Sequence, residues 1–201
     1  MSAGIDFWFS IGSTYTYLSV MRIGALARRE GVAVAWRPFS VRTLMVEQNN
    51  IPFRDKPVKA AYMWRDIERR AEGYGRQPRL PALYPLTQWD VANRIAVLAA
   101  QEGWCEAYAV ETYRRWFEEG FEPAIEPNLS ATLTAIGQDP ARVIAAQASD
   151  DIAVAYEAAT AAARSLNLFG APSFVTRGEI FWGDDRLEDA IVWAKNGTLR
   201  A

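Results

Sequence analysis

The sequence predicts an α/β fold in which a block of helices interrupts a small sheet. Three observations predict it: a strand–helix–strand pattern at the start, a strand pair between two helices at the end, and helical patterns without a strand signal over residues 43–148. The chain has 201 residues, half of them hydrophobic, which is enough for one substantial core with an inserted subdomain. We therefore expect residues 1–42 and 149–201 to form an α/β domain and residues 43–148 to form an all-helical insertion.

The first segment is predicted to be a parallel β-α-β unit. Residues 5–9 form a short aromatic and apolar strand, and residues 32–37 alternate as a second strand. Between them, residues 15–30 predict a helix, because arginines fill its last turn and Gly31 follows as a stop signal. Two strands joined by a helix of this length pair in parallel through a right-handed crossover.

The central block is predicted to consist of helices joined by proline-bearing loops. The helical patterns cover residues 57–71, 88–102, 104–119, 129–136 and 141–148. After this block, residues 150–166 predict a helix with acidic residues in its first turn. Strands at residues 172–176 and 179–182 flank a hairpin turn at Gly178, and residues 185–195 predict a closing helix.

The composition excludes several classes of chemistry. The chain contains no histidine and one cysteine, Cys105, so Ser-His-Asp and Cys-His catalysis, imidazole-based zinc sites and an intrachain disulfide are excluded. We predict no metal site. With 22 basic and 24 acidic residues, the chain lacks the basic excess that a nucleic-acid partner needs. The lone cysteine and the absence of a signal peptide or an apolar run of ~20 residues lead us to expect a cytoplasmic protein without a membrane partner.

The turn after the first predicted strand carries a cluster of hydroxyl groups. Gly12 is followed by Ser13-Thr14-Tyr15-Thr16 at the start of the predicted helix. The free N–H groups and the dipole at this helix end favour negative charge, and they would lower the pKa of a thiolate held there. Ser13 can donate a hydrogen bond to such a sulfur but cannot exchange disulfides. The alternative is that Ser13 or Thr14 only caps the helix. We therefore predict that the reactive sulfur comes from a cofactor.

Three further places are candidates for ligand contacts. Pro172 is either a cis-proline that turns the Ala171 backbone toward a peptide ligand or an ordinary trans-proline at a strand start. Asp184 and Asp185 enter the first turn of the last helix, where they complement the helix dipole or bind a ligand ammonium group. Lys59, near a loop–helix junction, either meets a ligand carboxylate or is solvated.

Four separated blocks of the chain carry a family resemblance. They are DFWF before Ser13 and Tyr17-Leu18, WRPF from residue 36, KAAYMWRD from residue 59, and GAPSF through FWGDDRL from residue 170. In this order they resemble the 2-hydroxychromene-2-carboxylate isomerases and the kappa-class glutathione transferases over nearly the whole chain. The resemblance implies a thioredoxin-like, DsbA-like fold split by a helical insertion, glutathione as cofactor and a homodimer.

The resemblance also implies roles for individual residues. Ser13 matches the serine that contacts the glutathione sulfur. Ala171, before Pro172, matches the residue whose backbone pairs with the cysteinyl unit. Asp185 matches the acid that meets the γ-glutamyl end, and Asn50 matches a position near substrate and glutathione.

The activity that the resemblance implies is glutathione-dependent cis–trans isomerisation of 2-hydroxychromene-2-carboxylate or a related aromatic 2-oxo acid, in aromatic-compound degradation. Ser13 is then the catalytic residue. Lys59, which matches a position near substrate and glutathione, is the first choice for the cation that binds the substrate carboxylate, and Arg37 is the second. The aromatic residues expected to line the site are Trp8, Tyr15, Tyr62 and Trp64.

Two other functions stay open at the level of sequence. A kappa-like glutathione transferase that conjugates electrophiles would use the same site residues. A non-catalytic thioredoxin-like binding protein is favoured by two departures from the family pattern, Thr14 where proline is common and Asp184 where serine or glutamine is common. A second negative charge beside Asp185 would weaken the contact with a γ-glutamyl carboxylate.

Overall fold

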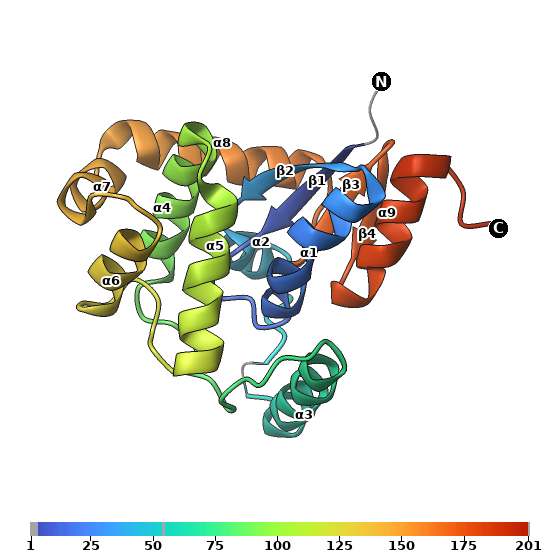
Figure 1. The fold of residues 1–201 in the computed structure, drawn as a ribbon, viewed down its shortest axis with the longest axis horizontal. Coiled ribbons are helices and arrows are strands. Elements are labelled where there is room, and N and C mark those ends of the chain that lie inside the picture. The colour runs from blue at the N-terminus through green and yellow to red at the C-terminus, as the bar shows by residue number, and fades with distance from the viewer. Residues whose placement is uncertain (1–3, 54, 201) are drawn as a thin grey trace.

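The computed structural model describes residues 4–53 and 55–200, and its centre is a four-stranded sheet (Figure 1). The strand order is β2-β1-β3-β4. β1 pairs in parallel with β2 and antiparallel with β3, and β3 pairs antiparallel with β4. The strands are β1 (Gly4–Phe9), β2 (Ala33–Pro38), β3 (Ser173–Thr176) and β4 (Glu179–Trp182). The predicted parallel unit and the predicted hairpin at Gly178 are confirmed.

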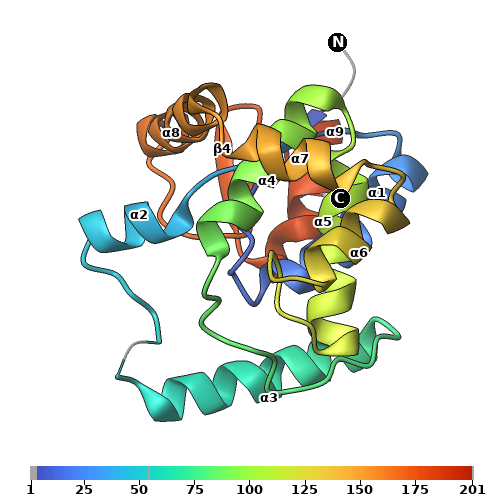
Figure 2. The ribbon, with the colours of Figure 1, turned by 90° about the vertical axis from the view of Figure 1, so that its left-hand side faces the viewer.

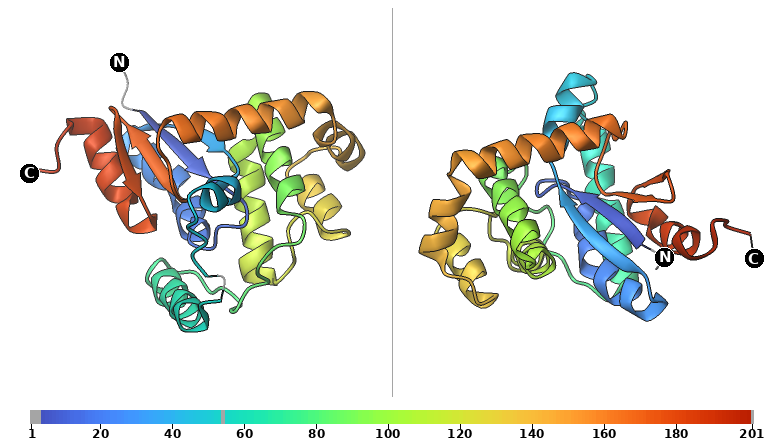
Figure 3. Two further views of the ribbon diagram at one scale, coloured as in Figure 1. Left: turned by 180° about the vertical axis from the view of Figure 1, so that it is seen from behind. Right: turned by 90° about the horizontal axis from the view of Figure 1, so that it is seen from above.

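Helices cover both faces of this sheet, as the view from above shows (Figure 3). α1 (Thr16–Glu30) and α9 (Leu187–Asn196) lie on one face, while α8 (Asp150–Ser165) crosses the other beside α2 (Val41–Glu47). A short 3-10 turn (Asp184–Arg186) leads into α9. Because successive strand residues point to opposite faces, β1 supplies apolar side chains to both layers.

The central helices extend the same core to one side of the sheet. They are α3 (Pro57–Gly73), α4 (Trp89–Glu102), α5 (Cys105–Arg114) with a π-helical turn (Arg115–Glu119), α6 (Asn128–Ala135) and α7 (Pro140–Gln147). Phe7 of β1, Ile95 of α4 and Trp116 of the π-turn are fully buried in one hydrophobic cluster. The sheet and the helical block therefore share one core.

Two helices, α2 and α3, lie at either end of one connecting loop, and each buries a few side chains in the cores. α3 runs along the bottom of the molecule, and α2 projects at the other end of the loop that leads to α3 (Figure 2). The sequence patterns predicted α3 but not α2, because α2 has seven residues and buries only Val41 and Leu44. No helix in the described ranges is long and apolar enough to cross a lipid bilayer.

Candidate active site

The hydroxyl-bearing turn lies between the end of β1 and the start of α1. The Ser13 backbone N–H donates to the Ser10 carbonyl at 3.0 Å, which closes the turn. The backbone N–H groups of Thr14 and Tyr15 have no hydrogen-bond partner among the described residues. These N–H groups and the positive end of the helix dipole make the turn a favourable place for a negative charge.

Ser13 is held against the loop that precedes β3. Its Oγ donates to the Ala171 carbonyl oxygen at 2.8 Å, across 158 positions of sequence. The Ala171–Pro172 peptide bond is cis, as the first of the two alternatives for Pro172 requires, and the pairing of Ala171 with a peptide ligand remains a prediction. A serine hydroxyl has one hydrogen to donate, so here Ser13 gives it to Ala171 and keeps its lone pairs as acceptors.

Two buried polar side chains from the helical block hold this turn in place. Asn93 on α4 is fully buried, donates from Nδ2 to the Ile11 carbonyl at 2.8 Å, and accepts the Ile11 N–H at 2.8 Å. The Tyr113 hydroxyl on α5 lies 2.9 Å from the Ser10 carbonyl oxygen and 3.1 Å from that of Ser13. Burial raises the pKa of Tyr113 well above its usual value, so it stays a donor. Sequence reasoning missed both residues, although a lone asparagine on the apolar face of a predicted helix was a signal.

A cavity of about 330 Å³ opens beside Ser13. Its wall includes two cations, Arg42 from α2 and Lys59 from α3, and among the described residues that line it none is acidic. Neither cation forms an ion pair with a described residue. The aromatic side chains on the wall are Tyr15, Phe53, Tyr62, Tyr84, Trp89, Phe169 and Trp182. An aromatic, positively charged cavity suits a flat anionic ligand.

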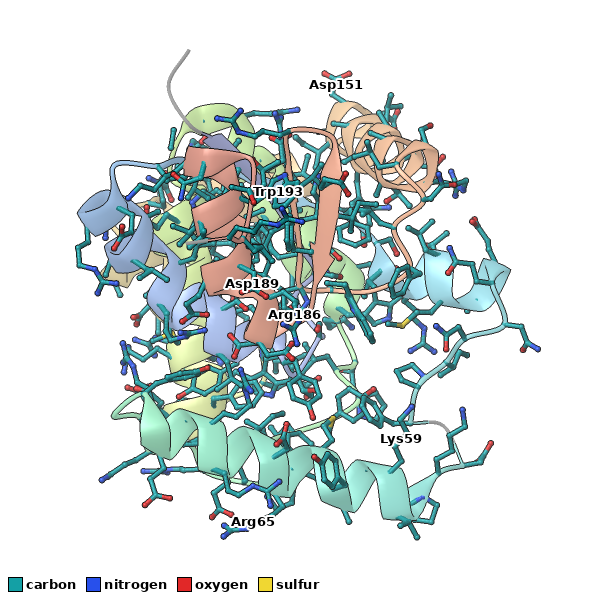
Figure 4. All side chains as sticks on the ribbon, turned by 90° about the vertical axis from the view of Figure 1, so that its right-hand side faces the viewer. Lys59, Arg65, Asp151, Arg186, Asp189 and Trp193 are labelled. Carbon is teal, nitrogen blue, oxygen red and sulfur yellow. The ribbon has the colours of Figure 1, made fainter. Side chains whose placement is uncertain are left out.

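The cavity gathers several residues that sequence reasoning selected. Ser13, Ala171, Asn50, Lys59, Tyr15 and Tyr62 all line it, whereas Pro172 is buried and does not. Lys59 Nζ lies 5.7 Å from the centre of the Phe53 ring. Figure 4 shows Lys59 on the side of α3 that faces the rest of the molecule and Arg65 on the outer side. Of the sequence-predicted cations, Lys59 is the one that reaches the cavity.

The Tyr15 hydroxyl is engaged by the molecule itself. It donates to Asp66 Oδ2 on α3 at 3.0 Å. Burial and this hydrogen bond raise the pKa of Tyr15, so the hydroxyl stays protonated. Tyr15 therefore presents its ring to the cavity and links α1 to α3.

Three of the predicted contacts are wrong because the side chains point elsewhere. Trp8 follows Phe7 on β1 and so points to the opposite face, where it is 6% exposed and packs edge-on against Phe39 at 5.9 Å. Arg37 on β2 donates from Nε to Asp6 Oδ1 at 2.8 Å and does not line the cavity. Trp64 packs edge-on against Tyr84, behind the cavity wall.

Asp184 has a structural role in place of the predicted ligand contact. Its side chain is 1% exposed and forms ion pairs with Arg22 at 3.1 Å and Arg70 at 2.8 Å. Ser19 and Tyr74 also donate to its oxygens. The carboxylate therefore joins α1, α3 and the turn before α9, and its charge is balanced inside the protein.

The other predicted acid and the second departure from the family pattern lie in different surroundings. Asp185 lies outside the cavity, its side chain is half-exposed, and it pairs with Arg186 at 3.0 Å. Its contact with a ligand remains a prediction. Thr14 is buried, and its hydroxyl donates to Met63 Sδ on α3. Thr14 therefore also fastens α3 to the turn.

Comparison with known proteins identifies the family. A model of the DsbA-like thioredoxin domain matches residues 4–190. The chain belongs to the DsbA-like thioredoxin family. Within the described ranges, this family member has no group of three His, Cys, Asp or Glu side chains close enough together to bind a metal ion. Its single cysteine, Cys105, is buried on α5.

Several relatives of this DsbA-like chain carry the name 2-hydroxychromene-2-carboxylate isomerase. A 2-hydroxychromene-2-carboxylate isomerase from Sphingobium xenophagum is 28% identical over 190 residues, which cover 94% of this chain and 96% of the relative. One from Pseudomonas putida is 26% identical over 185 residues, covering 91% and 90%. A solved structure of 2-hydroxychromene-2-carboxylate isomerase matches with a TM-score of 0.85 at 25% identity, over 98% of this chain and 100% of that one. The predicted fold and the resemblance to these isomerases are confirmed.

Proposed function

We propose that this protein is a glutathione-dependent isomerase of 2-hydroxychromene-2-carboxylate or a related aromatic 2-oxo acid. The observation that carries the proposal is the cavity, where aromatic side chains surround the Ser13 turn together with Arg42 and Lys59, which pair with no acidic side chain of the described residues. Such a wall matches a substrate with an aromatic ring and a carboxylate. The names of the relatives support the same activity.

Among the described residues that line the cavity there is no thiol. Cys105 is 4% exposed, lies on α5 and does not line the cavity. The Ser13 hydroxyl has no base to take its proton, because the sequence contains no histidine and none of the described lining residues is acidic. An external thiol fits here, since the free N–H groups of Thr14 and Tyr15 favour a thiolate. When bound, glutathione supplies the nucleophilic sulfur, whose reversible addition to a conjugated double bond permits rotation about it.

The residues of the chain bind, orient and exclude water. The Ser13 hydroxyl turns from the neutral Ala171 carbonyl to a thiolate, since a charge-assisted hydrogen bond is the stronger of the two. The Ala171 main chain pairs with the cysteinyl unit, and Asp185 meets the γ-glutamyl ammonium group. Lys59 binds a carboxylate at the mouth of the cavity. The aromatic wall excludes water around the reacting carbons.

The two departures from the family pattern do not count against ligand binding. The charge of Asp184 is balanced by Arg22 and Arg70, away from the cavity. The Thr14 hydroxyl is bonded to Met63. Thr14 and Asp184 therefore no longer favour the alternative of a non-catalytic binding protein.

The decisive experiment incubates the protein with 2-hydroxychromene-2-carboxylate, with and without glutathione, and follows the isomer by its ultraviolet spectrum. We expect the isomer to form only with glutathione, while titration shows a constant concentration of free thiol. Loss of free thiol would instead indicate a conjugating transferase. Calorimetric binding of glutathione without turnover would indicate a binding protein.

A matched pair of variants on α3 tests the place of the cofactor. Lys59→Gln removes the cation that faces the cavity, whereas Arg65→Gln removes one from the outer side, where it pairs with Glu68 (Figure 4). We expect Lys59→Gln to weaken glutathione binding about 5-fold, because the lost charge-assisted interaction is partly screened by solvent. Calorimetry should show unchanged binding for Arg65→Gln. Equal affinities for both variants would contradict this placement.

A further inference from the structure

Arg42 is a cation of the cavity that the family resemblance does not assign. It lies on α2, is exposed and lines the cavity. Its guanidinium carbon lies 5.5 Å from the centre of the Trp89 ring. Among the described residues the Arg42 side chain forms no hydrogen bond and no ion pair, so its five N–H donors are available to a ligand.

Trp89 connects Arg42 to the reactive turn. A Cβ placed on Gly12 would lie 3.8 Å from the Trp89 Cβ, so Trp89 packs directly against the residue before Ser13. Arg42 therefore lies over the ring of a residue whose Cβ lies beside the turn. The acidic neighbour Asp90 faces a second cavity with Arg94 and forms no ion pair with Arg42. The Arg42 charge acts on the Asp90 carboxyl through space, but no hydrogen bond joins the two, so the guanidinium N–H groups can serve a ligand beside the turn.

Lys59 reaches the cavity from a different element. It lies on α3 over the Phe53 ring, at the far end of the loop that leads from α2. Figure 2 shows α2 and α3 as separate helices on either side of that loop. Arg42 and Lys59, which form no ion pair within the described ranges, thus reach the cavity from two helices, and each can bind a different anionic group.

We infer that Arg42 binds the carboxylate of the aromatic substrate, while Lys59 serves glutathione; this inference rests on the proposed function. A planar guanidinium presents paired N–H donors that match a carboxylate, which a lysine ammonium does not. The Trp89 indole beneath it offers a flat apolar surface to the substrate ring. The substrate class is therefore a planar aromatic 2-oxo acid, and uncharged enones are disfavoured.

The test compares Arg42→Gln, Arg42→Lys and the control Arg37→Gln, whose side chain pairs with Asp6 outside the cavity. Because a charge-assisted hydrogen bond is lost, Arg42→Gln should raise the KM of the 2-oxo acid about 10-fold with little change in kcat. Arg42→Lys should recover part of this, and Arg37→Gln should match the wild type. The methyl ester of the same substrate should bind equally to wild type and Arg42→Gln. Glutathione affinity, measured by calorimetry without substrate, should be unchanged.

Two results for Arg42→Gln would overturn the inference. One is an unchanged KM for the 2-oxo acid, and the other is a loss of affinity for glutathione instead of for the 2-oxo acid. Failure of the proposed function is a separate outcome, because it shows as a wild-type protein without glutathione-dependent turnover. In that case calorimetry with the aromatic 2-oxo acid alone still tests whether Arg42 binds its carboxylate. Binding by the wild type that is lost in Arg42→Gln supports the role of Arg42, and equal binding by both proteins refutes it.

Discussion

Replacing Ser13 by alanine should raise the pKa of the thiol of bound glutathione by about one unit. In the structure the hydroxyl hydrogen of Ser13 points to the Ala171 carbonyl at 2.8 Å. A neutral thiol can accept this arrangement and donate to Ser13 Oγ. A thiolate cannot donate, so ionisation of the sulfur makes the hydroxyl turn toward it.

The magnitude follows from the two hydrogen bonds that compete for one hydrogen. The neutral bond to Ala171 contributes about 1 kcal/mol, and a charge-assisted bond to the sulfur contributes about 2.5 kcal/mol. The difference, about 1.5 kcal/mol, corresponds to roughly one pKa unit. Ser13 stabilises the ionised form, so it lowers the pKa of the bound thiol, and its removal raises that pKa. The free N–H groups of Thr14 and Tyr15 remain in the variant and limit the shift.

The assay titrates the ultraviolet absorbance of the bound thiolate against pH, and the pH profile of kcat/KM should move by the same amount. The matched control is Ser165→Ala on α8, which also removes a bond from a hydroxyl to a backbone carbonyl, that of Ala161 at 3.1 Å. Ser13→Thr keeps a hydroxyl and should restore most of the shift. An unchanged thiol pKa in Ser13→Ala, or an equal shift in the control, would refute the role of Ser13.

Three further predictions concern the parts that hold the site together. Asp184→Asn should lower the free energy of unfolding by about 3 kcal/mol in urea, because it leaves two arginines without their buried partner, whereas the half-exposed Asp185→Asn should change it by less than about 0.5 kcal/mol; equal losses would contradict this. Asn93→Ala should lower the free energy of unfolding by about 2 kcal/mol and speed hydrogen exchange of the amides in the active-site turn, because the Ile11 N–H and carbonyl lose their partner. Unchanged exchange rates would contradict the role of Asn93 in holding this turn. Gly170→Ala should displace the Trp182 indole, against which the new Cβ would collide, and so weaken substrate binding; an unaltered indole fluorescence and affinity would show that the ring has room to adapt.

Local patterns in the sequence were sufficient to predict most of the helices and strands, though not α2, and the residues on the Ser13 side of the cavity. The β-α-β start, the hairpin with positive φ at Arg177 and Gly178, and most of the central helices follow from periodicity and stop signals. Ser13 and Ala171 were predictable because each stands at the end of an element, where a sheet brings chain ends together.

Tertiary packing decided the remaining contacts. Arg42 lies on a helix too short to show a periodic pattern, and its neighbour in space, Trp89, is 47 positions away in the chain. The pleat of β1 turns Trp8 away from the site. Asp6, also on β1, forms an ion pair with Arg37 of the neighbouring strand β2. Asp184 became a buried structural charge because Arg22 and Arg70 converge on it from two other helices.

The sequence by itself therefore determined most of the segments that become helix or strand, α2 excepted, and that a hydroxyl, not a thiol, stands at the start of the first helix. Only the tertiary structure decided which charged side chains form ion pairs with one another and which remain available to bind a ligand. The reason is physical: helix and strand formation depend on residues a few positions apart, whereas the pairing of charges depends on contacts between segments that are distant in the chain.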